Sequence, residues 1–279
     1  MNSIPRRGVL ALGLGTLASL SGCLGFSTSR ETSESFERSF PAADVATLQV
    51  LNPVGGVTVV ADDGDEVRVR VVKRVRGEGI SLEDVVVSMP LDDGELAIET
   101  VLPDRAPARF QTASATITVT VPTGDAGPAV QSIASVVGEI SLSGTRGDTV
   151  VRGDVGDIAA SNVDGYLSLS TQVGTVTAND VTGLDRATTE VGDLKVDLLG
   201  LRGDVEAGTD VGDVVVGVRD DLLLDVLAES NGRVDSDLSL SELVADGNRL
   251  TGRLNGGGHR LHAYSDVGDV SLRALRSTA

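Results

Sequence analysis

The chain has almost no lysine and few aromatic residues. Only Lys73 and Lys195 are lysines, there is no tryptophan, and the aromatic residues are four phenylalanines and two tyrosines. A protein that binds nucleic acid presents a basic face to the phosphates and often stacks aromatic rings on the bases. Because the net charge is −18 as well, the composition excludes nucleic acid as a partner and weakens any sugar-binding site built on ring stacking.

Cysteine and histidine are also scarce. Cys23 is the single cysteine, and His259 and His262 are the only histidines. No disulfide can form within the chain, and two histidines three positions apart point to opposite faces of a strand. Zinc and non-haem iron sites and a Ser-His-Asp triad all need more of these residues. We therefore expect no cofactor and no enzyme activity.

The remaining charge is strongly acidic. There are 41 acidic and 23 basic residues, and so many carboxylates repel one another in dilute buffer. In molar salt the Debye length falls to about 3 Å, and this repulsion nearly vanishes. The composition is typical of a protein from a salt-loving archaeon, although an ordinary acidic secreted protein stays an alternative.

The N-terminus has the organisation of an export signal. Arg6 and Arg7 precede an apolar run from Gly8 to Leu20. Thirteen helical residues span about 20 Å, too short for the ~30 Å hydrocarbon core of a membrane. The twin arginines resemble a Tat signal, and Leu20-Ser21-Gly22-Cys23 resembles a lipobox. We interpret residues 1–22 as a signal peptide and Cys23 as the lipid attachment site, which anchors the protein to the extracellular face of the cell membrane. An uncleaved anchor stays an alternative.

Two further segments precede the repeats. Residues 23–39 are rich in Ser, Thr and Glu without a period, which favours a flexible spacer behind the lipid. Residues 40–127 alternate apolar and polar positions, as in "EVRVRV" (66–71) and "TITVTV" (116–121), and turn sequences occur at 62–65 and 91–95. This pattern predicts antiparallel β-strands joined by hairpins.

Residues 128–276 repeat a glycine-marked unit. Gly138, Gly156, Gly174 and Gly192 are 18 residues apart, and steps of 20 lead to Gly212 and Gly232. The unit can be written [Ser/Thr/Gly]-x-Val-Gly-x-[Ile/Leu/Val]. Short β-like segments at a fixed period near 20 indicate a solenoid. The sequence thus predicts an all-β fold, a parallel β-solenoid (β-helix) of 18–20-residue coils preceded by the antiparallel portion. The residues flanking the glycines are expected to point inward: Val155, Ile158, Val191, Leu194, Val211 and Val214.

An acidic residue follows the glycine in most coils. If the coils stack in register, these carboxylates form a column about 4.8 Å apart: Glu139, Asp157, Asp193 and Asp213. Thr175 interrupts the column. Calcium prefers six to eight oxygen ligands, so the column is a candidate metal site, and a solvated acidic edge is the favoured alternative.

The tripeptide Arg-Gly-Asp, which many animal cell-surface receptors recognise, occurs at 146–148, 152–154 and 202–204. The glycines of these tripeptides fall on the repeat or on its nine-residue half-step. We interpret all three as turn sequence rather than as receptor ligands.

The order of "ITVTVP" (117–122), glycine-marked repeats and "GGGHRLHAYSDVGDVSL" (256–272) resembles a domain-of-unknown-function family labelled "putative adhesin". The resemblance covers roughly residues 45–275. It implies a β-solenoid and no established catalytic residues. The leading hypothesis is a non-enzymatic cell-surface lipoprotein for adhesion, protein interaction, or envelope structure or sensing, with an unidentified envelope protein or glycan as partner. The alternative is a carbohydrate-active β-helix enzyme that uses paired surface carboxylates.

Overall fold

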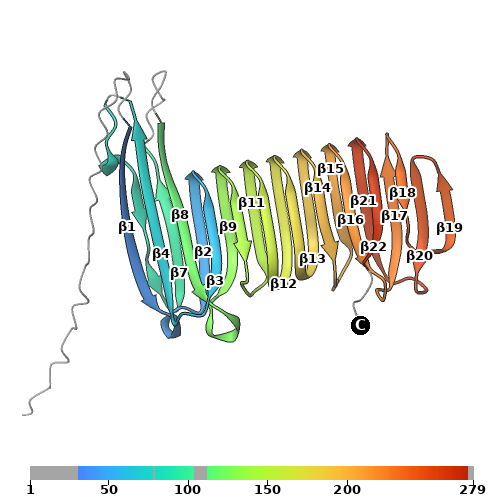
Figure 1. Cartoon of the computed structure of the whole chain (residues 1–279), viewed down its shortest axis with the longest axis horizontal. Helices are drawn as coiled ribbons and strands as arrows, with labels where there is room; N and C mark the ends of the chain where they lie inside the picture. The colour runs from blue at the N-terminus through green and yellow to red at the C-terminus, as the bar shows by residue number, and fades with distance from the viewer. Residues whose placement is uncertain (1–30, 78, 104–111, 276–279) are drawn as a thin grey trace, which may run out of the picture.

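A computed structural model describes residues 31–77, 79–103 and 112–275. The all-β prediction is confirmed: 22 strands form one hydrogen-bonded network that mixes parallel and antiparallel pairs. The strands lie across the long axis of an elongated molecule, with β1 and β4 at one end and β19 and β20 at the other (Figure 1).

Eight strands form the N-terminal region, residues 31–127. They are β1 (Glu31–Pro41), β2 (Thr47–Val54), β3 (Val57–Asp62), β4 (Glu66–Arg76), β5 (Val86–Ser88), β6 (Leu91–Asp92), β7 (Glu95–Val101) and β8 (Thr112–Pro122). Three short 3-10 turns accompany them: η1 (Ala42–Asp44), η2 (Leu82–Asp84) and η3 (Gly124–Ala126).

The prediction that residues 40–127 are antiparallel is wrong in part. Strand β4 is antiparallel to β1 and β8, but β2 is parallel to β7, and β3 is parallel to β8. The expected hairpin at 62–65 does not form, because β8 lies between β3 and β4. The hairpin at 91–95 does form, with Asp93 and Gly94 in the left-handed region at φ of 49° and 82°. Alternation marks a half-buried strand but does not say which strand lies beside it.

The predicted spacer is also shorter than the sequence suggests. Residues 31–39, which lack a clear period, form most of β1, an edge strand paired with β4 along its whole length. Only Phe36 and Phe40 of β1 pack against the core. An edge strand with one partner can carry many polar residues, so its pattern resembles that of an unstructured segment.

The remaining strands form the stacked region, residues 129–275. They are β9 (Ala129–Val137), β10 (Ile140–Ser143), β11 (Thr149–Val155), β12 (Ile158–Val173), β13 (Val176–Val191), β14 (Leu194–Leu198), β15 (Val205–Val211), β16 (Val214–Arg219), β17 (Leu224–Ser230), β18 (Val234–Ser236), β19 (Ser241–Asp246), β20 (Arg249–Leu254), β21 (His259–Val267) and β22 (Val270–Leu275).

The repeat period is the pairing register of this region. Ile140 pairs with Ile158 and Ile158 with Val176, all in parallel, so partners lie 18 residues apart. The next steps join Val176 to Leu194 and Leu194 to Val214. The parallel strands form two rows, and β12 and β13 run from one row into the other. The buried aliphatic residues of both rows make up one continuous core.

The order in space departs from the order in sequence near the C-terminus. Strand β21 lies between β15 and β17, and β17 also pairs with β20, which is antiparallel to it. After β16 the chain leaves the position beside β15 empty and forms β17–β20 farther out. It then returns as β21, which occupies the position between β15 and β17. As a result Gly268, and not Gly232, lies against Gly212.

Candidate interaction surface

Each glycine that marks the repeat lies in a tight corner between the two rows. Gly192 has φ of +146°, and a Cβ placed on it would lie 2.1 Å from the carbonyl oxygen of Gly174 in the preceding repeat. Side chains rarely adopt this backbone conformation, and no side chain fits the contact. The glycine is therefore required by stacking at this distance as well as by the turn.

A buried hydroxyl column supports the same corner. Thr189 Oγ1 donates to the carbonyl oxygen of Gly174 at 2.9 Å, and Thr209 Oγ1 donates to that of Gly192 at 3.0 Å. Thr171 and Ser265 make the corresponding bonds to Gly156 and Gly212. In these four repeats the first position of the sequence unit thus satisfies the glycine carbonyl of the neighbouring repeat. The repeat showed that this position is Ser or Thr in most coils, but the sequence did not show what the hydroxyl does.

The predicted acid column exists in register, and Asp269 extends it. Asp157 Oδ1 accepts the backbone N–H of Thr175 at 2.7 Å, Asp193 Oδ1 accepts that of Asp213 at 2.9 Å, and Asp213 Oδ1 accepts that of Asp269 at 2.8 Å. One oxygen of each of these carboxylates therefore links its repeat to the next. Among the residues that the structure describes, no three His, Cys, Asp or Glu side chains are grouped so that they could hold a metal ion. With Asp269 included, the acid column comprises Glu139, Asp157, Asp193, Asp213 and Asp269.

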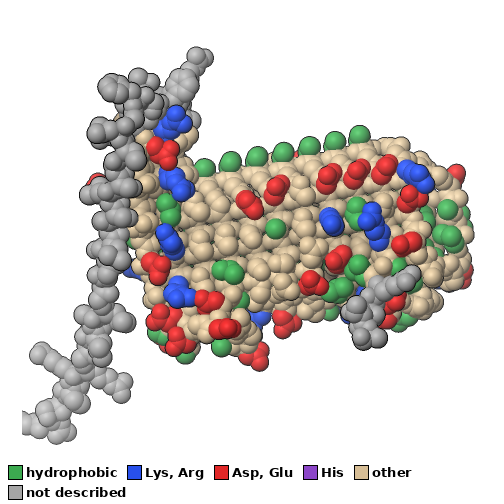
Figure 2. Space-filling model, viewed as in Figure 1, with side chains coloured by type: hydrophobic (Ala, Val, Ile, Leu, Met, Phe, Trp, Pro, Cys, Tyr) green, Lys and Arg blue, Asp and Glu red, His purple; other side chains and the backbone are tan. Residues whose placement is uncertain are grey.

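The prediction that both residues flanking each glycine point inward is half wrong. Ile158, Leu194 and Val214 are buried. The valines before the glycines lie past the end of the core, on the outer edge of the corner, and are 45–62 % exposed. We call this row the valine ladder, and its members are Val137, Val155, Val173, Val191, Val211 and Val267. Figure 2 shows hydrophobic side chains in a row along the upper edge of the molecule, with acidic side chains running beside them.

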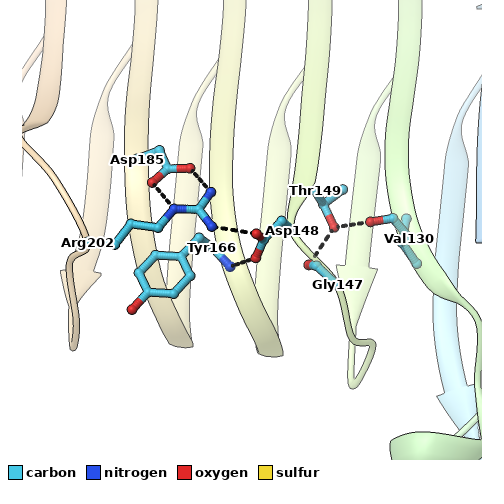
Figure 3. Close-up of polar contacts among 7 residues, drawn as sticks. All are labelled: Val130, Gly147, Asp148, Thr149, Tyr166, Asp185 and Arg202. Atoms are coloured by element: carbon cyan, nitrogen blue, oxygen red, sulfur yellow. Dashed lines mark hydrogen bonds and ion pairs between the residues drawn. The ribbon is translucent and has the colours of Figure 1, made fainter.

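Two residues of the Arg-Gly-Asp tripeptides, Asp148 of the first and Arg202 of the third, make contacts within the molecule (Figure 3). Arg202 pairs with Asp185 and with Asp148 at 2.5 Å, and its guanidinium lies 4.5 Å from the ring centre of Tyr166. Asp148 also accepts the backbone N–H of Tyr166 at 2.9 Å. The arginine of the third tripeptide therefore binds the aspartate of the first, and both contribute to packing of the stack.

This cluster shifts the pKa of Asp148. The backbone N–H of Tyr166 and then the Arg202 guanidinium hold the pKa of that carboxyl below its usual value, because both stabilise the ionised form. The carboxylates of Asp185 and Asp148 raise the pKa of Arg202. Asp148 and Arg202 are therefore both charged at neutral pH.

The two histidines lie near acidic residues on the C-terminal strands. His262 Nε2 lies 3.4 Å from Glu229, and His259 Nδ1 lies 3.8 Å from Asp204. His262 also packs against Tyr264, and both line a surface depression of about 410 Å³. Burial, followed by the hydrogen bond to Glu206, raises the pKa of Tyr264 to about 12.

The residues expected to direct export and anchoring, Arg6, Arg7 and Cys23, lie outside the described residues. Within the described part of the chain, no helix has the length and apolar character needed to span a membrane.

No family model matches the sequence, and no curated protein matches it. Solved structures similar to the chain include a "putative adhesin" from Bacteroides fragilis, at 16 % identity and a TM-score of 0.44 over 87 % of this chain and 97 % of that one. A "putative cell adhesion protein" from Clostridium sporogenes has 10 % identity and a TM-score of 0.41 over 88 % and 100 %. A "putative lipid binding protein" from Parabacteroides distasonis has 12 % identity and a TM-score of 0.38 over 88 % and 95 %. Likenesses at this level establish neither the fold nor the function of this chain.

Proposed function

We propose that the chain is a non-enzymatic cell-surface lipoprotein whose stacked region is a β-solenoid that presents long, regular rows of side chains to a partner. The observation that carries this proposal is the constant parallel register, which repeats each exposed position from coil to coil. A repeated position forms a straight row, and solenoids use such extended surfaces for binding.

The sequence supports an external location for this surface. The twin arginines and the lipobox-like segment ending at Cys23 favour export and lipid attachment. We infer that a lipid on Cys23 tethers the domain and that residues 24–30 separate it from the membrane. The acidic composition suits an envelope bathed in concentrated salt, as around a halophilic archaeon.

The test of the interaction is a pull-down with the full-length protein in its native host. The protein is cross-linked in intact cells, the envelope is solubilised in molar salt, and the bait is purified. We expect one envelope protein or glycan to be enriched relative to an unrelated lipoprotein expressed at the same level. Recovery of the bait alone, together with unchanged surface behaviour of a deletion strain, would contradict the proposal.

The anchor has a separate test. Cys23→Ser removes the only thiol that can carry a lipid. We expect the variant to leave the membrane fraction for the medium, because each buried methylene of a lipid contributes about 0.8 kcal/mol to anchoring. Ser21→Ala, which keeps the cysteine, is the matched control. Continued tight membrane association of the Cys23→Ser protein would contradict lipid anchoring.

A further inference from the structure

The valine ladder is an unusual apolar surface. Single exposed aliphatic residues are common in proteins, but a continuous apolar row points to a binding surface. The ladder runs through six consecutive strands in register. At about 4.8 Å per strand its five steps span about 24 Å. Val155, Val173 and Val191 in its centre are 46–48 % exposed.

Carboxylates flank the ladder on both sides. Four of its valines occur in the tetrapeptide acid-Val-Gly-acid, at 154–157, 190–193, 210–213 and 266–269. The acid column lies on one side of the ladder. The residues one position before these valines, which we call the outer acid row, precede the ladder along the chain, whereas the acid column follows it. Because the valines themselves pair in register, the outer row follows the same line: Asp154, Glu190, Asp210 and Asp266.

None of the eight carboxylates in these four tetrapeptides makes an ion pair within the described residues, although nine ion pairs join arginines to carboxylates elsewhere. Two arginines, Arg152 and Arg186, line the same depression as part of the outer acid row. Arg186 pairs with Glu206 instead. Among the described residues no arginine therefore neutralises these carboxylates, although Asp157, Asp193 and Asp213 each accept one backbone N–H.

We propose that the valine ladder, with the acid column and the outer acid row, is a docking site for a cationic amphipathic helix of a partner protein. This inference rests on the proposed interaction function and names the chemistry of the partner. A second copy of the chain fits poorly, because pairing two ladders would bring carboxylates of both copies together. A partner with an apolar stripe between lysines or arginines complements both the ladder and its flanks.

Helix geometry agrees with the ladder. The apolar stripe of a helix returns once per turn, every 5.4 Å, which is close to the ~4.8 Å step of the valines. A helix of about 16 residues is as long as the ladder, since each residue adds 1.5 Å. Over two or three turns the difference between the two spacings adds up to less than about 2 Å, so side chains one turn apart can lie between successive valines there, while basic residues on each side reach the two acid rows.

The experiment measures binding of a synthetic helical peptide to the purified full-length protein. The probe is an 18-residue peptide with a leucine stripe flanked by lysines, and a peptide of the same composition in scrambled order is the reference. The test variant combines V155T, V173T and V191T, which keep the β-branched shape and the charge. The matched control combines V86T, V101T and V244T, at valines that are 52–66 % exposed away from the ladder. Circular dichroism confirms that both variants fold.

We expect the ladder variant to bind the probe at least about tenfold more weakly than the wild type, and the control variant to bind within about twofold of it. The scrambled peptide should bind the wild type more weakly than the probe does. Equal binding by the ladder variant, or by the scrambled peptide, would overturn the proposal. A wild-type dimer that dissociates in the ladder variant would overturn it in favour of a second copy.

A charge variant tests the flanks. D154N, E190Q and D210N neutralise outer-row residues that accept no side-chain hydrogen bond from any described residue of the neighbouring repeat, so the stack is preserved. We expect weaker binding at low salt and a difference that fades towards molar salt, whereas the loss caused by the ladder variant persists. A charge effect that does not depend on salt would contradict the assigned role of the flanks. If the probe peptide does not bind the wild-type protein but the envelope pull-down succeeds, the docking site is overturned and the proposed function stands. If the pull-down fails, the proposed function is contradicted.

Discussion

The N-terminal region and the stacked region are both built from β-strands around an aliphatic core, but they arrange their strands in different orders. In the N-terminal region, β3 and β4 follow each other in sequence but are separated by β8. In the stacked region, most parallel partners lie 18 or 20 residues apart. The regular offset places a glycine, a hydroxyl and a carboxylate at the same corner in most repeats. The stacked region therefore adds a regular series of polar contacts to the aliphatic core that both regions share.

The largest expected effect separates a glycine packed against a neighbouring repeat, Gly192, from a turn glycine with open space around it, Gly124. Gly192→Ala would need a left-handed backbone and would place a methyl group 2.1 Å from a carbonyl oxygen. We expect a loss of more than about 3 kcal/mol in the free energy of unfolding. Gly124→Ala in the N-terminal region also has a positive φ, of 61°, but meets nothing within 4 Å. It should cost only about 1 kcal/mol.

Chemical denaturation of both glycine variants measures this difference. Equal losses would show that the turn conformation, and not the close approach of stacked coils, sets the requirement for glycine.

The next effect concerns buried threonines. Thr209→Val removes the donor to the Gly192 carbonyl in a fully buried position. We expect a loss of about 1–3 kcal/mol, because the carbonyl is left without this partner. Thr100 in the N-terminal region is equally buried, and its hydroxyl has no partner among the described residues. Thr100→Val should be neutral or stabilising, by up to about 1 kcal/mol.

Thermal unfolding of the two threonine variants at one pH and salt concentration checks this contrast. If Thr100→Val is as destabilising as Thr209→Val, the hydroxyl column does not explain the Ser and Thr of the repeat.

The smallest effect is the pH dependence due to Asp148. Its folded-state pKa lies below the unfolded value near 3.9. The ionised group therefore stabilises the protein above that value, and the contribution is lost as the pH falls through the folded pKa. Because the carboxylate is more than half exposed, the effect should be small.

Melting temperatures between pH 6 and pH 2 test this prediction. Asp148→Asn should lower stability at pH 6 and flatten the decline below pH 4, and Arg202→Gln should do so in part, since the Tyr166 N–H remains. An unchanged decline in both variants would show that other carboxylates dominate acid unfolding.

Much of the fold could be predicted from the sequence. The glycine period gave the pairing register of the stacked region, because strands in parallel register repeat their side-chain positions at the coil length. The acid column followed from the same period, and Asp157, Asp193 and Asp213 do lie in line. These carboxylates accept the backbone N–H groups of the next repeat. That contact depends on the distance between repeats, which the period of the sequence does not specify.

The repeat of 18–20 positions, and the residues that share a row, can be read from the sequence alone. The place of each row relative to the core, and the choice of neighbouring repeats, depend on how distant strands pack. Val191 and Leu194 look alike in the repeat, yet one is 47 % exposed and the other is buried. The reason is that the core ends at the corner, and its edge is set by the packing of two rows of strands. In the same way Gly268 lies against Gly212 because the chain returned to an unfilled strand edge, a long-range pairing that no local pattern specifies.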